Sequence, residues 1–365
     1  MDGVEVVRYL LDSGLLSSQA VVDGRVTVRE ESRRNSNHAV LVDDGPGYLV
    51  KQGATRDGRI TVDHEAEVYQ YLTNTTAAAH LPRMIHCDRS RHLVVLELLA
   101  DAVDLRRWHT RTRRPPVSLA AGAGVALATL HSCAAKAGGS AIPGLPPAVD
   151  TRPWTLTMHR PHARTAWHLS GATLDLIARL QDDQHACDRL DDLARNWCDD
   201  ALIHGDLRWD NILGHRPGGH GQLKATLVDL ELAGSGDARW DVGSFLGEHL
   251  ACWLLSIPLA GNAPPERYLD LAQRPLRLMH PAIAAFWRAY RRTACVADNA
   301  TNQWLRTAVS YAGVRLLHLA LEEAQHTPQT TPAIICLFRV AVNVLTRPDH
   351  ARTDLLGLTT AQGTA

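Results

Sequence analysis

The stretch Leu202-Ile203-His204-Gly205-Asp206-Leu207-Arg208-Trp209-Asp210-Asn211-Ile212-Leu213 is the part of this 365-residue sequence that decides the fold. Its apolar ends suit short strands, and they enclose a polar loop. A second acidic element follows in Thr226-Leu227-Val228-Asp229-Leu230-Glu231, where an aliphatic strand ends in a carboxylate. Phosphoryl transfer needs a base that orients the attacking hydroxyl, and oxygen ligands that hold magnesium against the nucleotide phosphates. Asp206, Asn211 and Asp229 match that need.

The ordered pattern HGDxxxxN, followed by an apolar strand that ends in Asp, resembles the signature of aminoglycoside phosphotransferases, choline kinases and methylthioribose kinases. The resemblance spans most of the chain and implies a protein-kinase-like fold, with Asp206 as catalytic base, Asn211 and Asp229 as metal ligands, and ATP and Mg²⁺ as cofactors. Two other interpretations are a chance polar turn and a metal hydrolase built on His204. Three ordered matches disfavour the first, and no second histidine at ligand spacing supports the other.

Two further residues are expected to support the catalytic loop. The family counterpart of His204 orders this loop. The stretch Gly236-Asp237-Ala238-Arg239-Trp240-Asp241-Val242-Gly243 resembles the family's helix entry, whose last Asp braces the loop through backbone hydrogen bonds. The resemblance therefore implies a supporting role for His204 and Asp241.

The amino-terminal part is expected to hold the nucleotide through a lysine and an acidic partner. Lys51 ends the strand-like stretch GYLVKQ, and a helix that contains Glu65 and Glu67 follows. Such an ion pair positions a lysine on the nucleotide phosphates. The family's helix pattern favours Glu65 as the partner, while Glu67 stays open, and a solvated edge lysine is the alternative interpretation of Lys51.

The expected phosphate loop, Glu31–His38, lacks the glycines that kinases place there. Aminoglycoside phosphotransferases also lack a strict glycine pattern at this point. Serine and asparagine permit tight turns and offer donors to phosphate, so Ser36 is a candidate nucleotide-binding residue. Arg33 and Arg34 either reach phosphate or face solvent.

The strand LVVLELLAD is a candidate hinge between the two lobes. Backbone groups near Glu97 and Leu99 would then pair with the edge of the nucleobase. The alternative is a plain core strand, and the two interpretations are compatible.

The pattern of apolar residues divides the chain into two lobes of an α+β protein. Strands with tight turns and one helix form a small amino-terminal antiparallel sheet lobe, and long periodic segments form a larger, mainly helical lobe. The segment Ala137–Trp154 is rich in Gly and Pro and predicts an irregular connection. The expected boundaries are 1–98 for the nucleotide-binding lobe, 99–353 for the catalytic and acceptor-binding lobe, and 354–365 for a flexible tail.

The composition is typical of an ordinary globular protein, with 45% hydrophobic residues, 21% charged residues and a net charge of −1. This balance disfavours a nucleic-acid partner. Seven scattered cysteines predict reduced, mostly buried thiols, and neither a secretory signal nor a membrane span is recognisable. We therefore expect a cytoplasmic protein without a membrane partner. The acidic run from Asp182 to Asp200 is either a solvated helix face or a cation-attracting groove.

The acceptor hydroxyl is less well defined by the sequence. Enzymes that modify polycationic drugs tend toward acidic composition, because a negative field concentrates such substrates, whereas this chain is nearly neutral. The frame RPWTLTMHRPHARTAWHLSGATLDLIARLQ, with SRRNSNHAVLV and YLVKQ, resembles kinases of type V lanthipeptide biosynthesis. That resemblance implies a Ser or Thr acceptor in a ribosomally made precursor peptide, and a partner lyase that eliminates the phosphate. The alternatives are a small alcohol (an aminoglycoside, sugar or amino alcohol) and a nucleotide-binding pseudokinase scaffold.

Overall fold

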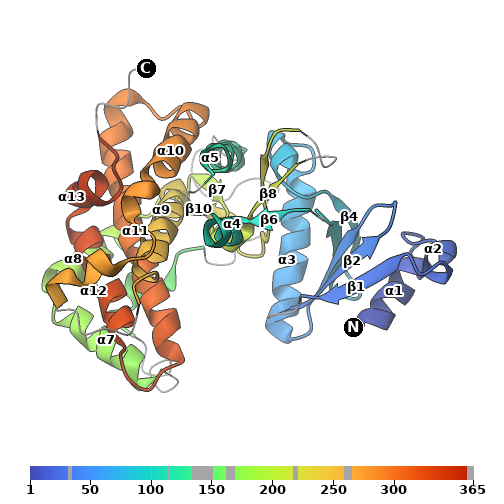
Figure 1. Cartoon of the computed structure of the whole chain (residues 1–365), viewed down its shortest axis with the longest axis horizontal. Helices are drawn as coiled ribbons and strands as arrows, with labels where there is room; N and C mark the ends of the chain where they lie inside the picture. The colour runs from blue at the N-terminus through green and yellow to red at the C-terminus, as the bar shows by residue number, and fades with distance from the viewer. Residues whose placement is uncertain are drawn as a thin grey trace.

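The computed structural model describes residues 1–31, 35–99, 101–112, 116–133, 151–161, 169–216, 221–258 and 265–359. The chain forms a small lobe around an antiparallel sheet and a larger lobe of helices, with the two lobes side by side in Figure 1. The α+β architecture expected from the sequence is confirmed. The connection expected at Ala137–Trp154 lies mostly outside the described residues, as do Arg33 and Arg34.

The small lobe is a five-stranded sheet in the order β1-β2-β3-β5-β4. Because side chains of a strand alternate between the two faces, Val94 and Leu96 pack on one side of the sheet while Leu93 and Val95 pack on the other. The strands are β1 (Val26–Glu30), β2 (Ser36–Val42), β3 (Tyr48–Gln52), β4 (Met84–Asp88) and β5 (Leu93–Glu97). Both faces are therefore covered.

Helices cover the two faces of this sheet. Helices α1 (Gly3–Asp12) and α2 (Ser18–Val22) pack on the sheet face that carries Leu93 and Val95. Helix α3 (Arg56–Leu72) packs between the sheet and the large lobe. Helix α3 begins at Arg56, where the Thr55 hydroxyl caps it by accepting a hydrogen bond from the Gly58 N–H. This helix carries Glu65 into the interior, where it is buried.

The large lobe consists mainly of helices, with short strands where it meets the small lobe. The helices are α4 (Leu105–Arg111), α5 (Val117–Ser132), α7 (Gly171–Gln181), α8 (Gln184–Arg195), α9 (Ala238–Leu254), α10 (His280–Thr293), α11 (Asp298–Gln325), α12 (Pro332–Thr346) and α13 (Pro348–His350). The strands are β6 (Val103–Asp104), β7 (Ala201–Ile203), β8 (Ile212–His215), β9 (Lys224–Leu227) and β10 (Gly234–Gly236). Short helical turns lie at Thr76–His80, Trp154–Thr157, Trp209–Asn211, Pro265–Leu271, Leu276–Leu278 and Ala351–Leu355.

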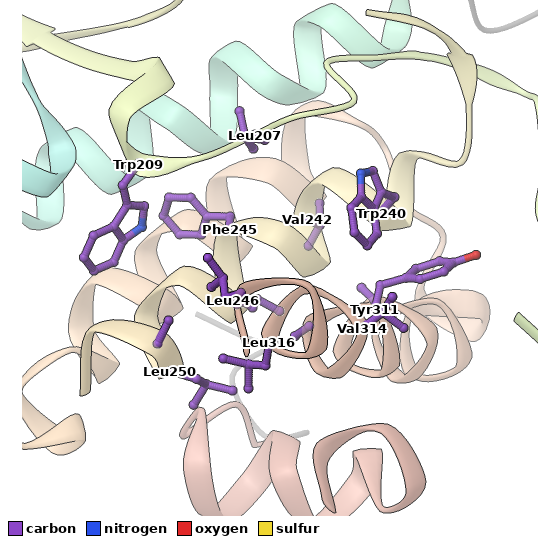
Figure 2. Packing of buried hydrophobic residues seen from close by; sticks show 14 of the residues in the cluster. Leu207, Trp209, Trp240, Val242, Phe245, Leu246, Leu250, Tyr311, Val314 and Leu316 are labelled. Atoms are coloured by element: carbon purple, nitrogen blue, oxygen red, sulfur yellow. The ribbon is translucent and has the colours of Figure 1, made fainter. Parts of the chain in front are cut away.

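Helices α9 and α11 form the centre of the large lobe. They cross closely at Gly243, where an added Cβ would lie 2.5 Å from the Ala308 carbonyl oxygen. Figure 2 shows Phe245 and Leu246 of α9 between Trp209 of the polar loop and Leu316 of α11. The polar loop therefore rests directly on the core of the lobe.

Two expectations need correction. Leu356 and Leu358 are buried in the core, which differs from a flexible tail that starts at residue 354. Of the seven cysteines, only Cys187 is buried and Cys295 is exposed, although all are free thiols. Of the two interpretations of the acidic run, the structure supports the solvated helix face, because α8 buries its apolar residues. In the part of the chain that the structure describes, no helix has the length and apolar character needed to cross a membrane.

Candidate active site

The polar loop between β7 and β8 carries Asp206 at the surface of the large lobe. The side chain of Asp206 is 31% exposed. Gly205, just before it, has φ +81°, and an added Cβ would lie 2.4 Å from the Leu232 carbonyl oxygen. A residue with a side chain is therefore excluded there by both the backbone angle and the space. The tight bend turns Asp206 outward.

Asp241 holds the loop in place from the first turn of α9. Its carboxylate accepts hydrogen bonds from the backbone N–H groups of His204 (2.6 Å) and Gly205 (3.1 Å). Asp241 is fully buried, and His131 lies 3.0 Å from the same carboxylate through Nε2. Trp240 also donates from its indole N–H to the Gly205 carbonyl at 2.9 Å. The structure thus brings Asp241 to the catalytic loop that the resemblance assigns to it.

Asn211 and His204 connect the loop to the strand that ends at Asp229. The side-chain amide of Asn211 donates to the Asp206 carbonyl at 2.9 Å, and its backbone carbonyl accepts from the Val228 N–H at 3.0 Å. The buried His204 donates from Nε2 to the Val228 carbonyl at 2.9 Å. These bonds place Asp206, Asn211 and Asp229 around one site.

Asp229 faces the small lobe in an unusual backbone conformation. Its φ is +67°, in the left-handed region where Asp and Asn are tolerated better than most residues. The Lys51 ammonium donates to Asp229 Oδ1 at 2.6 Å and to the two carboxylate oxygens of Glu65 at 2.8 and 3.0 Å. The Glu65 carboxylate also accepts from the Leu230 N–H at 3.2 Å. The lysine and both acids therefore form one cluster between the lobes, in which Lys51 and Glu65 are buried.

The pairing resolves which acidic residue of α3 meets Lys51. Glu65 is 1% exposed and contacts the lysine directly, whereas Glu67 lies at the surface and pairs with Arg89 at 3.4 Å. Burial opposes the ammonium form of Lys51, but the Glu65 and Asp229 carboxylates outweigh it and raise the pKa of Lys51 above its ordinary value. Lys51 is therefore a fixed positive charge at neutral pH.

The three other nucleotide candidates are Ser36, Glu97 and Leu99. Ser36 pairs with Gln52 across β2 and β3, but its hydroxyl donates to the Met1 carbonyl at 3.2 Å, so the structure does not turn it toward Lys51. The Glu97 N–H donates to the Arg83 carbonyl at 2.8 Å, at the end of β5. Leu99 follows in the passage from the small lobe to the large lobe. A nucleotide role for these residues stays a prediction.

Sequence reasoning missed two residues that link the lobes. Asn35 donates from its side-chain amide to the Glu231 carboxylate at 3.2 Å. His64 of α3 lies 2.7 Å from the Ala233 carbonyl through Nε2. Glu231 lies two positions after Asp229 in the sequence, and this spacing could have predicted a second acidic side chain near the site.

Sequence reasoning also missed a buried arginine beside Asp206. Arg315 of α11 is 1% exposed, and its guanidinium lies 4.0 Å from Asp206 Oδ1. The same guanidinium donates to Glu248 Oε1 at 2.9 Å, and Arg106 donates to the other Glu248 oxygen at 3.1 Å and to Asp210 at 2.6 Å. The single Arg inside the mainly apolar segment Tyr311–Ala324 could have predicted a buried ion pair, because buried charges require partners.

The side chains of Asn211 and Asp229 suit a hard metal ion. They offer amide and carboxylate oxygens, and the Asp229 side chain is 39% exposed despite its contact with Lys51. Among the described residues, no group of three His, Cys, Asp or Glu side chains forms a complete cage. Mg²⁺ is commonly held by one or two protein oxygens and completes its shell with water and substrate phosphates. The donor set therefore fits magnesium.

Beyond Arg315, the side chains of α11 on the side of Asp206 are partly exposed. His318 lies one turn after Arg315, and its Nε2 is 3.4 Å from Glu322, which also lies 3.7 Å from Arg208. Burial and the nearby Arg315 and Arg208 lower the pKa of His318 to about 3, so its ring is neutral. The exposed Trp154 packs against this ring edge-on at 5.5 Å between centroids.

The two-lobed fold, a lysine held by an acid on the adjoining helix, and a braced Asp beside two oxygen ligands define a phosphotransferase of the kinase type. The chain belongs to the phosphotransferase enzyme family, whose model matches residues 27–290. The prediction of a kinase that acts on a hydroxyl group is confirmed.

Solved structures with the same fold are distant in sequence. Choline kinase LicA from Streptococcus pneumoniae is 13% identical with a TM-score of 0.50, over 94% of this chain and 99% of that one. The GDP and kanamycin complex of APH(2")-IIIa is 13% identical with a TM-score of 0.50, over 94% of this chain and 98% of that one. A comparison with curated proteins found no match. At these identities the likeness shows the fold alone.

Proposed function

We propose that the protein transfers the γ-phosphoryl group of ATP to a hydroxyl, with Asp206 as the base and Lys51 on the nucleotide phosphates. The observation that carries this proposal is the single cluster in which Lys51 contacts both Glu65 and Asp229, next to the loop that presents Asp206. Magnesium held by Asn211 and Asp229 would neutralise phosphate charge during transfer. The solved complexes of LicA with AMP and of the APH(2") enzyme with GDP support the nucleotide assignment.

The reaction that these residues support is a direct displacement. Asp206 accepts a hydrogen bond from the acceptor hydroxyl and takes its proton as the oxygen bonds to the γ-phosphorus. The bond from the γ-phosphorus to the bridging oxygen breaks, and ADP leaves. Arg315, which is itself neutralised by Glu248, lies 4.0 Å from Asp206 Oδ1 and favours a fixed orientation of this carboxylate.

For the acceptor, we propose a Ser or Thr hydroxyl in a peptide. The groups along α11 beside Asp206 support it: Trp154 offers an exposed apolar face, and Glu322 already lies near Arg208 and His318. The near-neutral chain lacks the strong net negative charge that captures polycations. A small alcohol remains the second candidate because the choline kinase and aminoglycoside phosphotransferase structures share the fold. In the peptide reaction, the partner protein would be a lyase that eliminates the phosphate.

Two measurements separate the chemistry from the acceptor. We expect Asp206→Asn to lower turnover by at least about 100-fold while nucleotide affinity stays within about twofold, since the base acts in the transition state. The exposed Asp188→Asn is the matched control. An Asp206→Asn enzyme with wild-type turnover would remove Asp206 from the mechanism.

Mass spectrometry identifies the acceptor. The wild-type enzyme is incubated with ATP, magnesium and any precursor peptide that is encoded next to its gene, with and without any lyase that is encoded there. The expected result is one added phosphate per modified residue, or loss of water when the lyase is present. Phosphorylation of kanamycin, a sugar or an amino alcohol, without change to the peptide, would replace the peptide acceptor and leave the kinase assignment intact.

A further inference from the structure

A cavity of about 540 Å³ lies in the large lobe, and its lining includes none of the candidate active-site residues. It is formed where α10 ends, where α11 begins, and by the chain after α13. Its charged lining consists of four arginines against one acid: Arg288, Arg291, Arg292, Arg352 and Asp298. The lining is therefore strongly positive.

The fold explains only part of this charge. Basic residues near the end of a helix interact favourably with its dipole, which accounts for Arg291 and Arg292 on α10. Arg291 also forms an ion pair with Asp298. Arg288 lies one turn before Arg292, however, and like charges at this spacing destabilise a helix. In the described part of the chain, neither of these two side chains has a hydrogen bond or an ion pair, so their role is not structural pairing.

Arg352 adds a charge from a separate segment of the chain. It donates from Nη1 to the Asn302 side chain at 3.2 Å, while its Nε is buried and has no hydrogen-bond partner among the described residues. A buried donor without a partner costs free energy, which a bound acceptor would recover. Arginines from α10 and from the chain after α13 thus line one cavity.

The start of α11 contributes further donors and an apolar wall. This 28-residue helix begins at Asp298, directly after the N-cap residue Ala297, and no side chain caps it. Ala297 and Thr301 line the cavity, so the positive end of a long helix faces the same space. Trp287, Leu305 and Leu358 supply apolar surface, and the volume is in the range of small-molecule sites.

We propose that this cavity binds a small organic phosphate: a phosphomonoester carried on an apolar or aromatic body. Guanidinium groups bind phosphate through paired hydrogen bonds, and the wall formed by Trp287 and Leu305 accommodates the body. The ligand site is independent of phosphoryl transfer, because no residue of the active-site cluster takes part. It is a second binding site on the enzyme.

Calorimetric titration with phenyl phosphate tests the proposal on the full chain. Inorganic phosphate supplies the charge without the body, and benzyl alcohol supplies the body without the charge. The double variant Arg288→Ala/Arg292→Ala removes two exposed, unpaired guanidiniums and should fold normally. Arg339→Ala, at an exposed position of α12, is the matched control. Lys51→Ala reports any binding at the active site.

We expect phenyl phosphate to bind more tightly than either half-probe, and its affinity to fall about tenfold or more in the double variant. The affinity should be unchanged in Arg339→Ala and Lys51→Ala, and it should weaken as salt is added. Equal affinity in the wild type and the double variant would overturn the proposal, as would a loss caused by Lys51→Ala alone. Absence of wild-type binding up to millimolar phenyl phosphate would also overturn it. None of these outcomes depends on which acceptor the enzyme phosphorylates.

Discussion

Lys51 forms ion pairs with two carboxylates at once, and this gives a direct test of the nucleotide site. Glu65→Ala removes its buried partner, so we expect the lysine to lose its fixed position and the KM for ATP to rise, with a larger defect in Lys51→Ala. Glu67→Ala is the matched control, because Glu67 lies two residues away on the same helix and pairs with Arg89. Steady-state kinetics measure all three variants. Equal damage from Glu65→Ala and Glu67→Ala would show that the buried pair has no role.

Arg315 is the second residue-scale test, since it contacts Asp206 from inside the lobe. Arg315→Lys keeps the positive charge but loses the planar, forked guanidinium that bonds Glu248 through two nitrogens. We expect kcat to fall about 10- to 100-fold, because small displacements of a catalytic group are costly, with nucleotide affinity unchanged. Thermal unfolding checks that the variant is folded. An unchanged kcat in a folded variant would restrict Arg315 to a structural role.

At the scale of elements, the crossing of α9 and α11 positions both Asp241 and Arg315. Gly243 allows the close approach, so Gly243→Ala would press a methyl group against the Ala308 carbonyl and the Tyr311 Cβ at 2.6 Å. We expect a loss of about 1–3 kcal/mol in the free energy of unfolding, together with lower activity. Urea unfolding measures it. The control is Gly14→Asn, where the left-handed turn has no atom within 4 Å of an added Cβ, and wild-type stability for Gly243→Ala would contradict the tight crossing.

The elements show which parts of the fold a sequence can predict. Alternation and turn residues predicted the sheet of the small lobe, and helical spacing predicted the mainly helical large lobe, because these signals are local. The helix that carries Glu65 was also predicted, and it is α3 in the structure. The catalytic loop was identified through its motif. Arg315 and the Asn35–Glu231 contact were not, because they join segments that are far apart in the sequence.

At the scale of the whole molecule, buried histidines make stability dependent on pH. His109 and His249 pack around Trp209 of the catalytic loop, with ring centroids 3.8 and 4.7 Å from the indole. Burial lowers the pKa of His249 from 6.5 to about 3 and that of His109 to about 4. Below pH 6.5 the unfolded chain therefore binds protons that the folded chain does not, and stability falls as the pH decreases toward 3.

The lowered pKa of His249 sets the expected size of the stability change. At pH 5, His249 alone should reduce the free energy of unfolding by about 2 kcal/mol relative to pH 7. Urea unfolding of wild type, His249→Leu and the exposed control His185→Leu at both pH values tests this. His249→Leu should show a smaller difference between the two pH values, whatever its stability at pH 7. The same difference in all three proteins would exclude His249 as a cause.

The left-handed backbone at Asp229 limits which substitutions the position tolerates. Asparagine and glycine adopt such a φ readily, whereas alanine and β-branched residues pay strain in addition to any lost contact. In a library of all substitutions at residue 229, folded but inactive enzymes should therefore concentrate in Asn and Gly. Asp229→Asn would then be the preferred variant for binding an acceptor without phosphorylating it. Few substitutions at this position would be tolerated during evolution.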